Sequence, residues 1–402
     1  MGKRAKENSS LNELGLETEP NDQQKDSPRS QPLKNDKKQT PRGNGKKGKA
    51  KKNEGLTEAR RNRKDEFYTQ LSDIEKELSN YRHLFKDKIV FCNCDDPYES
   101  NFFKYFALNF NQLGLKKLIA TCYSGSPVSG NQIQLFEDEN DEDDLLPGYK
   151  IEINGVKDLN NDGAVDLLDI EQLLLQEKNT SSRLLGNGDF KSPEAIELLK
   201  QCDIVVTNPP FSLFRDFITQ LIEHNKQFLV LGSEPAVSYA EIWPLIQKGK
   251  IWMGVNSGPM SFRVPEYYEA RPSGYWQDDT GQKWRKLGNI CWFTNLDHSK
   301  RHQNLALFKR FAPEDYPSFN FYRAINVDAI KDIPVDYFEP MGVPITFLNK
   351  HNPDQFELLD ANDFRNGAPR KRHGLIKDSD GSVGSKNKFV RILIRRKNAN
   401  NS

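Results

Sequence analysis

The sequence predicts an α/β protein built on a largely parallel sheet, and three observations lead to this fold class. Between residues 66 and 123, apolar runs and amphipathic segments follow one another in the order helix, strand, helix, strand. The apolar run at 203–207 ends abruptly in Asn208-Pro209-Pro210-Phe211, as a buried strand with a rigid polar loop at its tip would. Further strand-like runs follow after another helical segment. Because open α/β sheets bind ligands beyond the carboxyl ends of their strands, we expect the functional residues there.

Each element has its own signal. Apolar residues at spacings of three and four predict an amphipathic helix over residues 66–86. Residues 88–92 and 118–123 are expected to be buried strands, and Ser100 is placed to cap the helix between them. Helices at 193–200 and 212–224 and a strand at 228–232 follow. Beyond about residue 235, short β-like runs alternate with Gly and Pro turns, which indicates closing strands mixed with a more irregular region.

Length, charge and cysteine content limit the classes of protein that this chain could be. Its 402 residues suffice for two domains, and 58 Lys and Arg against 57 Asp and Glu leave it nearly neutral. Residues 1–55 are nevertheless rich in Lys and Arg and poor in aromatic residues, and we expect them to be a disordered arm. The chain has no apolar run of the roughly 20 residues that a membrane span needs. Five scattered cysteines and no signal peptide predict a reduced, cytoplasmic protein that does not contact a membrane.

The stretch from residue 158 to 169 has the spacing of an EF-hand calcium loop. Carboxylate or amide side chains occupy loop positions 1, 3, 5, 9 and 12, and Gly163 occupies position 6. The expected ligands are Asp158, Asn160, Asp162, Ala164, Asp166 and Asp169. The last of these is shorter than the usual Glu, which would weaken bidentate coordination. The alternative is a polar turn that caps the next helix without an ion, and a bound calcium would be structural only.

The loop after residue 207 carries residues suited to chemistry on an amino group. The side-chain oxygen of Asn208 and the carbonyl of Pro209 can both accept hydrogen bonds from one amino nitrogen, and Phe211 offers a flat face for a planar base. The alternative is a strand followed by an ordinary proline turn. Asn208-Pro209-Pro210-Phe211 resembles the catalytic loop of amino-methyltransferases, which use S-adenosylmethionine.

Several segments in one order make the resemblance more specific. They are Phe67-Tyr68-Thr69, the strand end at Asp95-Asp96-Pro97, the Gly188-Asp189-Phe190 turn, the Asn208 loop, and the stretches 341–348 and 352–357. Over residues 64–397 the chain resembles the EcoRI-type adenine-specific DNA methyltransferase family. The resemblance implies a Rossmann-like S-adenosylmethionine-dependent methyltransferase fold with a C-terminal target-recognition region, and N6-methyladenine in duplex DNA as the product.

The resemblance also implies roles for individual residues. Tyr68 and Thr69 would hold the methionine end of S-adenosylmethionine. Asp189 would accept a hydrogen bond from the cofactor's adenine, with Phe190 packed on its ring. A second cofactor segment takes the place of the usual glycine-rich loop, and it consists of Asp95, Asp96 and Pro97. The alternatives are a turn for Asp189 and helix capping for the aspartate pair.

The resemblance implies a domain organisation and a set of partners. Residues 1–55 would be the basic arm, 56–235 the catalytic domain with an EF-hand-like insertion near 150–185, and 236–402 the closing strands with the recognition region. The substrate would be double-stranded DNA with its target adenine flipped out of the helix, because a stacked base cannot reach the methyl group. A restriction endonuclease acting on the same site would be a further partner, and we expect a monomer. Candidate DNA contacts are the basic clusters at 300–302, 309–310 and 370–373, with Lys386 and Lys388.

Two other functions remain open at this level. Protein glutamine methyltransferases also use an Asn-Pro-Pro-aromatic loop, but they need neither a basic arm nor a recognition region of roughly 160 residues. A non-catalytic DNA-binding protein on a methyltransferase fold is the second, and intact Asn208, Asp189 and Phe67-Tyr68-Thr69 speak against it.

Overall fold

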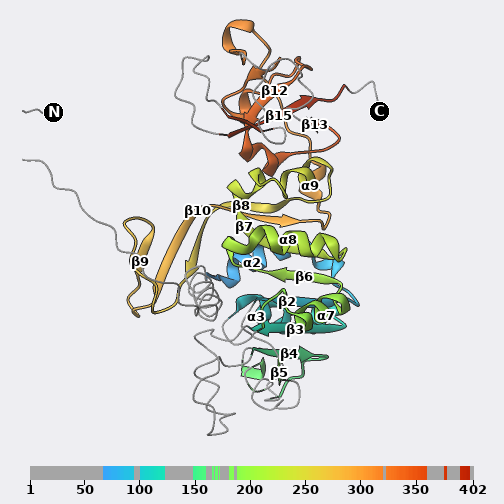
Figure 1. Cartoon of the computed structure of the whole chain (residues 1–402), viewed down its shortest axis with the longest axis vertical. Helices are drawn as coiled ribbons and strands as arrows, with labels where there is room; N and C mark the ends of the chain where they lie inside the picture. Colours follow the sequence, from blue (N-terminus) through green and yellow to red (C-terminus); the bar gives the residue numbers. More distant parts are fainter. Residues whose placement is uncertain are drawn as a thin grey trace, which may run out of the picture. The chain divides into compact units, whose positions relative to one another are not determined.

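The computed structural model describes residues 67–94, 100–122, 148–159, 165–166, 168–170, 172, 181–184, 188–319, 323–359, 375–377 and 390–398. All of them belong to the compact unit Lys51–Ser402. The described strands form two sheets, one of ten strands and one of five (Figure 1).

The larger sheet has the strand order β1-β8-β10-β7-β6-β2-β3-β4-β5, with β9 paired to the outer end of β10. Its central strands β7, β6, β2 and β3 are parallel, and the flanking strands pair antiparallel. The predicted α/β class is therefore confirmed, but the sheet is mixed rather than largely parallel, since β1, β4, β5, β8, β9 and β10 pair antiparallel. The strands are β1 Tyr68–Thr69, β2 Ile89–Asn93, β3 Lys117–Cys122, β4 Tyr149–Ile153, β5 Ser181–Arg183, β6 Ile204–Thr207, β7 Gln227–Ser233, β8 Trp252–Arg263, β9 Tyr275–Gln277 and β10 Lys283–Thr294.

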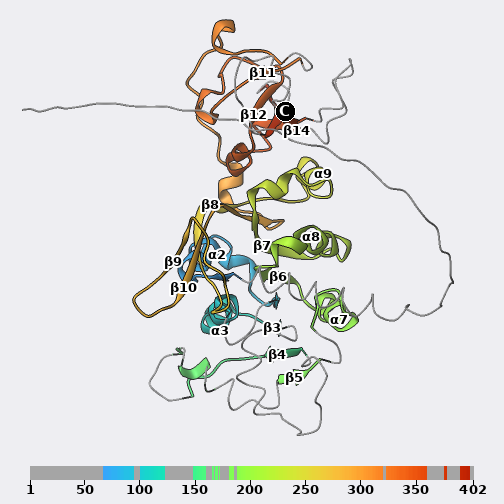
Figure 2. The same cartoon turned by 60° about the vertical axis from the view of Figure 1, so that its left-hand side comes forward.

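Helices cover both faces of the parallel strands. Figure 2 shows α2 and α3 on one side of the strands and α7 and α8 on the other. The alternation of β6 explains this, because Ile204 and Val206 pack in the core beneath α2 and α3 while Val205 packs in the core beneath α7 and α8. The α-helices are α2 Leu71–Leu78, α3 Asn101–Leu108, α4 Phe110–Leu113, α7 Pro193–Gln201, α8 Phe214–Glu223 and α9 Trp243–Gln247. Short 3₁₀ helices, labelled η, are η1 Arg82–Leu84, η3 Phe211–Leu213, η4 Glu234–Ser238, η5 Ser299–His302, η6 Pro313–Asp315, η7 Ile330–Asp332 and η8 Ile345–Lys350.

Local signals account for several helix starts. Ser100 begins α3 as predicted, because its Oγ accepts the Phe102 amide at 3.1 Å. Ser192 begins α7 in the same way, with Pro193 at the first helical position. The predicted helix at 212–224 is present as η3 followed by α8.

The predicted helix over 66–86 is wrong in its extent. Tyr68 and Thr69 form the edge strand β1, paired with Arg263 and Phe262 of β8, and α2 spans only Leu71–Leu78. The apolar periodicity still marks buried positions, because Ile74, Leu78, Tyr81 and Phe85 are all fully buried. Tyr81 and Phe85 lie beyond α2, directly before and after η1. Pairing with a strand distant in sequence outweighs the local helical pattern at 68–69.

The smaller sheet is formed near the carboxyl terminus. It has the order β11-β12-β15-β13, with β14 also paired to β15, and only β11 and β12 are parallel. Its strands are β11 Ile325–Asn326, β12 Met341–Pro344, β13 Phe356–Leu358, β14 Leu375–Lys377 and β15 Val390–Arg396. Its buried residues Met341, Val343 and Ile392 belong to the same apolar cluster as Phe214 and Phe217 of α8, so the core is continuous between the two sheets.

Within the described ranges, no helix is both long and apolar enough to cross a membrane.

Candidate active site

Three polar side chains meet at the carboxyl ends of β2, β3 and β6. Thr121 Oγ1 donates to Asn93 Oδ1 at 3.1 Å, and Thr207 Oγ1 donates to the main-chain carbonyl of Asn93. All three side chains are buried. The network holds the three strand ends together, so the loop after Thr207 starts from a rigid base.

The amide group of Asn208 has a fixed orientation directly beyond β6. Its Nδ2 donates to the main-chain carbonyl of Phe67 at 2.6 Å. Its Oδ1 is buried and has no hydrogen-bond partner among the described residues. Since a buried oxygen left unpaired costs free energy, this atom is placed to accept from something that binds. An amino group of a substrate would supply the missing donor.

Phe211 belongs to an aromatic cluster beside this loop. Its ring is stacked on Phe67, with centroids 5.7 Å apart and planes inclined by 23°. Phe67 also makes edge contacts with Phe262 of β8 at 5.6 Å and with Tyr268 at 6.1 Å. Phe211 remains partly exposed. The cluster therefore offers apolar aromatic surface next to the unpaired oxygen of Asn208.

Thr69 contributes a second unpaired oxygen. The residue is 3% exposed, and no residue in the described ranges hydrogen-bonds to its Oγ1. Its main-chain carbonyl accepts the side-chain amide of Asn101, at the start of α3, at 2.7 Å. The neighbouring Tyr68 lies under the guanidinium of Arg263, 4.9 Å from the ring centroid to Cζ. The Phe67-Tyr68-Thr69 segment is thus fastened to α3 on one side and to β8 on the other.

Asp189 and Phe190 lie in a turn that begins α7. Asp189 Oδ1 accepts a hydrogen bond from the amide of Lys191 at 2.9 Å. This bond is typical of a turn, the alternative role predicted for Asp189. Phe190 is 3% exposed and makes an edge contact with Phe217 at 5.1 Å. Phe190 is thus mainly a core residue, and its contact with a cofactor stays a prediction. The predicted cofactor residues Asp95, Asp96 and Pro97 lie outside the described residues.

A buried carboxylate joins α2 to β8. Glu77 of α2 accepts the amides of Val255 at 2.7 Å and Asn256 at 2.8 Å, and the hydroxyl of Tyr81 at 3.0 Å. Burial raises the pKa of Glu77 above its ordinary value. A Cβ at Gly254 would lie 2.4 Å from Glu77 Oε1, so only glycine lets β8 approach this closely. No sequence pattern marks Glu77 as the link between α2 and β8, because its partners are 178 and 179 residues away.

The calcium hypothesis is not supported. Among the described residues, no group of three or more His, Cys, Asp or Glu side chains could hold a metal. The buried carboxylate of Asp169 instead accepts the amides of Leu159 at 2.7 Å and Asp166 at 2.9 Å. Asp166 Oδ1 accepts the amide of Leu168 at 2.8 Å. These are the contacts of a polar turn. Asp158, the first expected ligand, is also described and belongs to no metal-holding group among the described residues. The expected ligands Asn160, Asp162 and Ala164 lie outside the described residues.

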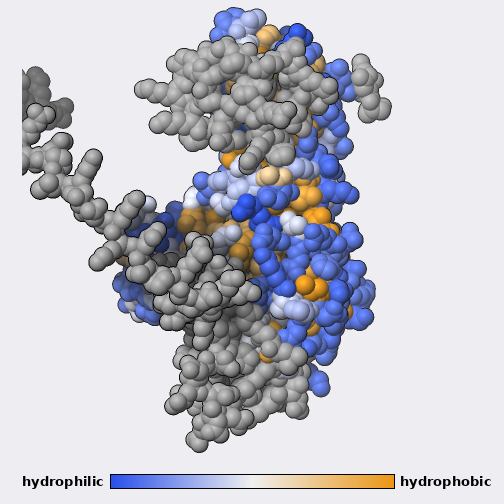
Figure 3. Space-filling view, viewed as in Figure 1, coloured by the Kyte–Doolittle hydropathy of each residue, from blue (hydrophilic) through white to orange (hydrophobic). Residues whose placement is uncertain are grey.

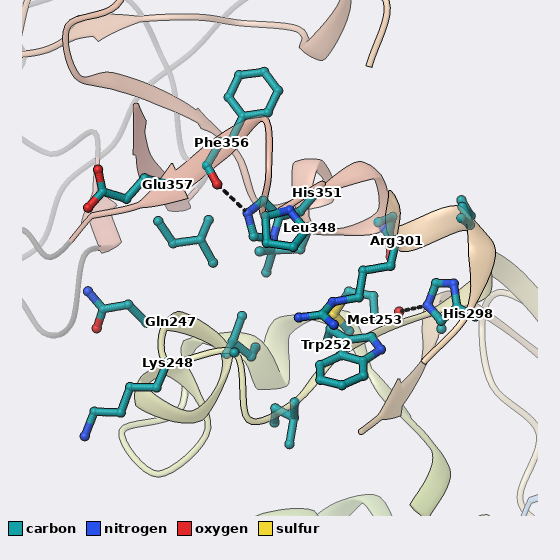
Figure 4. Close-up of a pocket in the computed structure, with 18 of the residues that line it drawn as sticks. Gln247, Lys248, Trp252, Met253, His298, Arg301, Leu348, His351, Phe356 and Glu357 are labelled. Atoms are coloured by element: carbon teal, nitrogen blue, oxygen red, sulfur yellow. Dashed lines mark hydrogen bonds between the residues drawn. The ribbon is translucent and has the colours of Figure 1, made fainter. Parts of the chain in front are cut away.

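A cavity of about 460 Å³ lies elsewhere, between α9, β8 and η5 on one side and η8 and β13 on the other (Figure 4). Neither Phe67-Tyr68-Thr69 nor the Asn208 loop lines it. Burial lowers the pKa of His351 in its wall to about 4, so this histidine is neutral at pH 7. Arg301 lies over the ring of Trp252 at 3.7 Å, and Lys300 donates to the Val255 carbonyl. These two members of a predicted DNA-contact cluster are therefore engaged in internal contacts.

A known family matches the chain over nearly all of these elements. The family model described as adenine-specific methyltransferase EcoRI matches residues 55–397. Together with an α/β sheet that presents an acceptor loop at the end of β6, this match defines the class of protein: the chain is an enzyme, an adenine-specific DNA methyltransferase. More particularly, it belongs to the EcoRI-type adenine-specific methyltransferase family.

Individual relatives agree with this family. The chain is 44% identical over 349 residues to the Type II methyltransferase M.EcoRI of Escherichia coli. The aligned region covers 86% of this chain and 97% of that protein. It is 40% identical to the Type II methyltransferase M.MpnI of Mycoplasma pneumoniae and 39% identical to M.MgeORF184P of Mycoplasma genitalium, each over 84% of this chain and 97% of the relative. No solved structure matches the chain.

Proposed function

We propose that the enzyme transfers a methyl group from S-adenosylmethionine to N6 of one adenine within a specific site in duplex DNA. The observation that carries the proposal is the buried, unpaired Oδ1 of Asn208, whose orientation is fixed by the bond from Nδ2 to the Phe67 carbonyl. An acceptor in this position suits an amino group, whose N–H it would bind; attack on the methyl group releases S-adenosylhomocysteine, and the extra proton of the methylated amine passes to water. Family membership supports the choice of adenine.

The chemistry follows from the nature of the target nitrogen. The lone pair of the adenine amino group is delocalised into the ring, so the group is a weak nucleophile. Hydrogen bonds to Asn208 Oδ1 and to the carbonyl of Pro209 draw its two hydrogens toward a tetrahedral arrangement, which frees the lone pair for attack. Bound S-adenosylmethionine supplies an electrophilic methyl group. Positioning of the two reactants then provides most of the acceleration.

The adenine has to leave the duplex to reach this loop. Asn208 stands beyond a buried strand end and Pro209 is buried, so a base stacked within DNA cannot approach them. We propose that the flipped base lies against Phe211, whose ring is supported from behind by Phe67. Pro210 holds the chain between the acceptors and this aromatic face, because its ring restricts the backbone.

The polar groups around Thr69 are suited to binding S-adenosylmethionine. The unpaired Oγ1 of Thr69 is a buried donor and acceptor only a short chain segment away from the Phe67 carbonyl that orients Asn208. Thr69 and Tyr68 would hold the methionine end, with Asp189 and Phe190 at the adenosine end. Asp95, Asp96 and Pro97 are assigned to the same cofactor site on the resemblance alone.

In this proposal the remaining parts of the chain bind DNA. Residues 236–402 supply strands β8 and β10 to the catalytic sheet, and they also carry the recognition region. The basic arm, residues 1–55, would contact phosphates without regard to sequence. The Type II relatives make a restriction endonuclease of the same specificity a candidate partner. The glutamine methyltransferase and non-catalytic alternatives gain no support from the family.

The proposal is tested by incubating the full chain with tritium-labelled S-adenosylmethionine and bacterial chromosomal DNA that lacks adenine methylation. Nuclease digestion and chromatography then identify the labelled nucleoside. The label is expected in N6-methyladenine alone, and sequencing of the product is expected to place it within one short motif. Label in protein, in cytosine, or in no product would overturn the proposal.

A further inference from the structure

We propose that the hairpin formed by β9 and the outer half of β10 grips double-helical DNA, with Trp276 as its principal contact. This inference rests on the proposed function, because the hairpin would hold the duplex from which one adenine is taken. Figures 1 and 2 both show this hairpin extending away from the helices that flank the sheet. It is an extension of the same strands that frame the candidate active site.

A row of side chains crosses four strands from the active site to the hairpin. The register pairs Tyr68 with Arg263, Arg263 with Trp284, and Trp284 with Trp276. Residues directly opposite each other in antiparallel strands lie on one face, so these four side chains form an outer row. Arg263 lies 4.9 Å from the Tyr68 ring, and Trp284 and Trp276 stack at 6.1 Å with their planes only 9° apart.

The outer row ends in an exposed indole. Trp276 is 40% exposed, whereas Trp243 and Trp292 are fully buried. The exposed ring, stacked on Trp284, adds to a continuous aromatic surface, and such surfaces mark interaction sites. Planar rings and a guanidinium group are surfaces on which bases and sugars pack, and such contacts tolerate any sequence.

The turn of the hairpin is held rigidly. Asp278 Oδ1 accepts the amides of Thr280 and Gln282, each at 3.0 Å, and Asp278 Oδ2 accepts the indole N–H of Trp284 at 2.8 Å. The Thr280 hydroxyl, which donates to Asp278 Oδ1 at 2.6 Å, and the Trp284 indole lower the pKa of Asp278, so its carboxylate is engaged within the turn. Gly281 takes a φ of +84° there, a conformation that favours glycine. A preorganised turn loses little entropy when it binds, which suits an interaction surface.

The charge of the outer row favours a polyanion. Arg263 belongs to the row, and Lys286 lies on the same face of β10 two positions from Trp284, while the carboxylate of Asp278 is bound to the Trp284 indole. The part of the hairpin visible in Figure 3 is hydrophilic, which argues against an apolar protein partner.

The opposite face of the hairpin is joined to the catalytic loop. Tyr275 of β9 stacks on Tyr268 at 6.5 Å, and Tyr268 contacts Phe67, which lies against Phe211. Aromatic contacts thus run from Phe211 to the hairpin. The strands that carry the outer row on one face thus carry these aromatic contacts on the other.

The test compares full-length Trp276→Ala, Trp276→Phe and Leu168→Ala proteins with the unaltered enzyme. Leu168 is a suitable control because it is 56% exposed and lies in the segment before α7, outside the region proposed to bind DNA. The probe is a duplex of randomised sequence at one fixed salt concentration, with a single strand of the same length as a second probe. Binding of S-adenosylmethionine, measured by calorimetry, reports whether each variant is folded.

We expect Trp276→Ala to weaken duplex binding by at least about tenfold. Trp276→Phe and Leu168→Ala should bind nearly as well as the unaltered enzyme, with cofactor affinity unchanged in all three. Duplex DNA should quench the tryptophan fluorescence of the unaltered enzyme, and Trp276→Phe should lose most of that quenching. Unchanged duplex affinity in Trp276→Ala, or full quenching in Trp276→Phe, would overturn the proposal.

Three further outcomes are informative, and the last two separate this inference from the proposed function. If Trp276→Ala loses affinity for the single strand but not for the duplex, the assignment to double-helical DNA is wrong. If the unaltered enzyme methylates DNA while Trp276→Ala binds normally, the hairpin inference alone fails. If no methyl group reaches DNA in the unaltered enzyme, the proposed function fails whatever the hairpin does.

Discussion

Asn208 Nδ2 donates to the main-chain carbonyl of Phe67 at 2.6 Å, although 141 residues separate the two in the chain. The bond joins the loop that follows β6 to the Phe67-Tyr68-Thr69 segment. It also determines which end of the Asn208 amide is left to accept a hydrogen bond. This contact therefore fixes the orientation of the Asn208 amide beside the proposed cofactor segment.

Phe211 is expected to tolerate other aromatic residues but not alanine. Its ring stacks on Phe67 and remains partly exposed, so Phe211→Ala removes a surface for the flipped base. The loss should be about 1–3 kcal/mol in binding of a duplex with a flipped target, read from the fluorescence of 2-aminopurine at the target position. Phe211→Trp should retain most of the signal. Equal damage from Ala and Trp would show that the ring acts in packing alone.

Asn101 is expected to act on the cofactor rather than on the chemical step. Its side-chain amide supports the carbonyl of Thr69 at 2.7 Å, and it does not touch the Asn208 loop. Asn101→Ala should therefore raise KM for S-adenosylmethionine while kcat changes by less than about threefold. Steady-state kinetics at saturating DNA measure both constants. A variant with normal KM and reduced kcat would contradict this role.

Glu77 is expected to make stability fall as pH rises. Its pKa is raised in the folded protein, so the folded state binds a proton more tightly than the unfolded state. The resulting contribution to stability is fully present below the ordinary value of 4.5 and is lost as pH rises through the higher folded pKa. Glu77→Gln should remove this dependence, and urea unfolding at a series of pH values measures it.

The same substitution should lower stability at low pH. One oxygen of Glu77 accepts from Tyr81 and Val255, and the other accepts from Asn256. In a glutamine, one of these oxygens is replaced by an NH₂ group, which would face N–H or O–H donors instead of accepting from them. The free energy of unfolding should therefore fall by about 1–3 kcal/mol. Glu77→Gln with unchanged stability and an unchanged pH profile would show that the carboxylate is not a link between α2 and β8.

Asp169 is expected to stabilise the protein without an ion. Its buried carboxylate accepts two amides, so Asp169→Ala should reduce the free energy of unfolding by about 1–3 kcal/mol. Lys157→Ala, an exposed change in the same segment, should have little effect. Thermal melts with calcium and with a chelator should coincide. A calcium-dependent rise in Tm that Asp169→Ala abolishes would reinstate the calcium loop.

The parts of the fold that were predictable from sequence are those with local causes. The parallel strands β2, β3, β6 and β7 follow from apolar runs, and the cap at Ser100 follows from the chemistry of its own side chain. The position of the Asn208 loop at a strand end was predictable for the same reason. Its Asn-Pro-Pro sequence breaks the strand wherever it occurs.

The parts that were not predictable depend on partners far away in the chain. Nothing near Tyr68 indicates that Arg263 would pair with it, and the strand that results shortens the predicted helix. The calcium hypothesis failed for a related reason. Carboxylates at EF-hand spacing can be used by main-chain amides instead of an ion, and only the folded loop reveals that Asp169 accepts two of them.

The central claim is that Asn208 acts on the target amine and not on the cofactor. The most direct measurement is the single-turnover rate of methyl transfer to DNA by Asn208→Ala, together with its affinity for S-adenosylmethionine. We expect the rate to fall by about 10²–10³-fold or more, as when one transition-state hydrogen bond is lost, while cofactor affinity stays near that of the unaltered enzyme. A near-normal rate, or a loss of cofactor binding that accounts for the whole defect, would contradict the account.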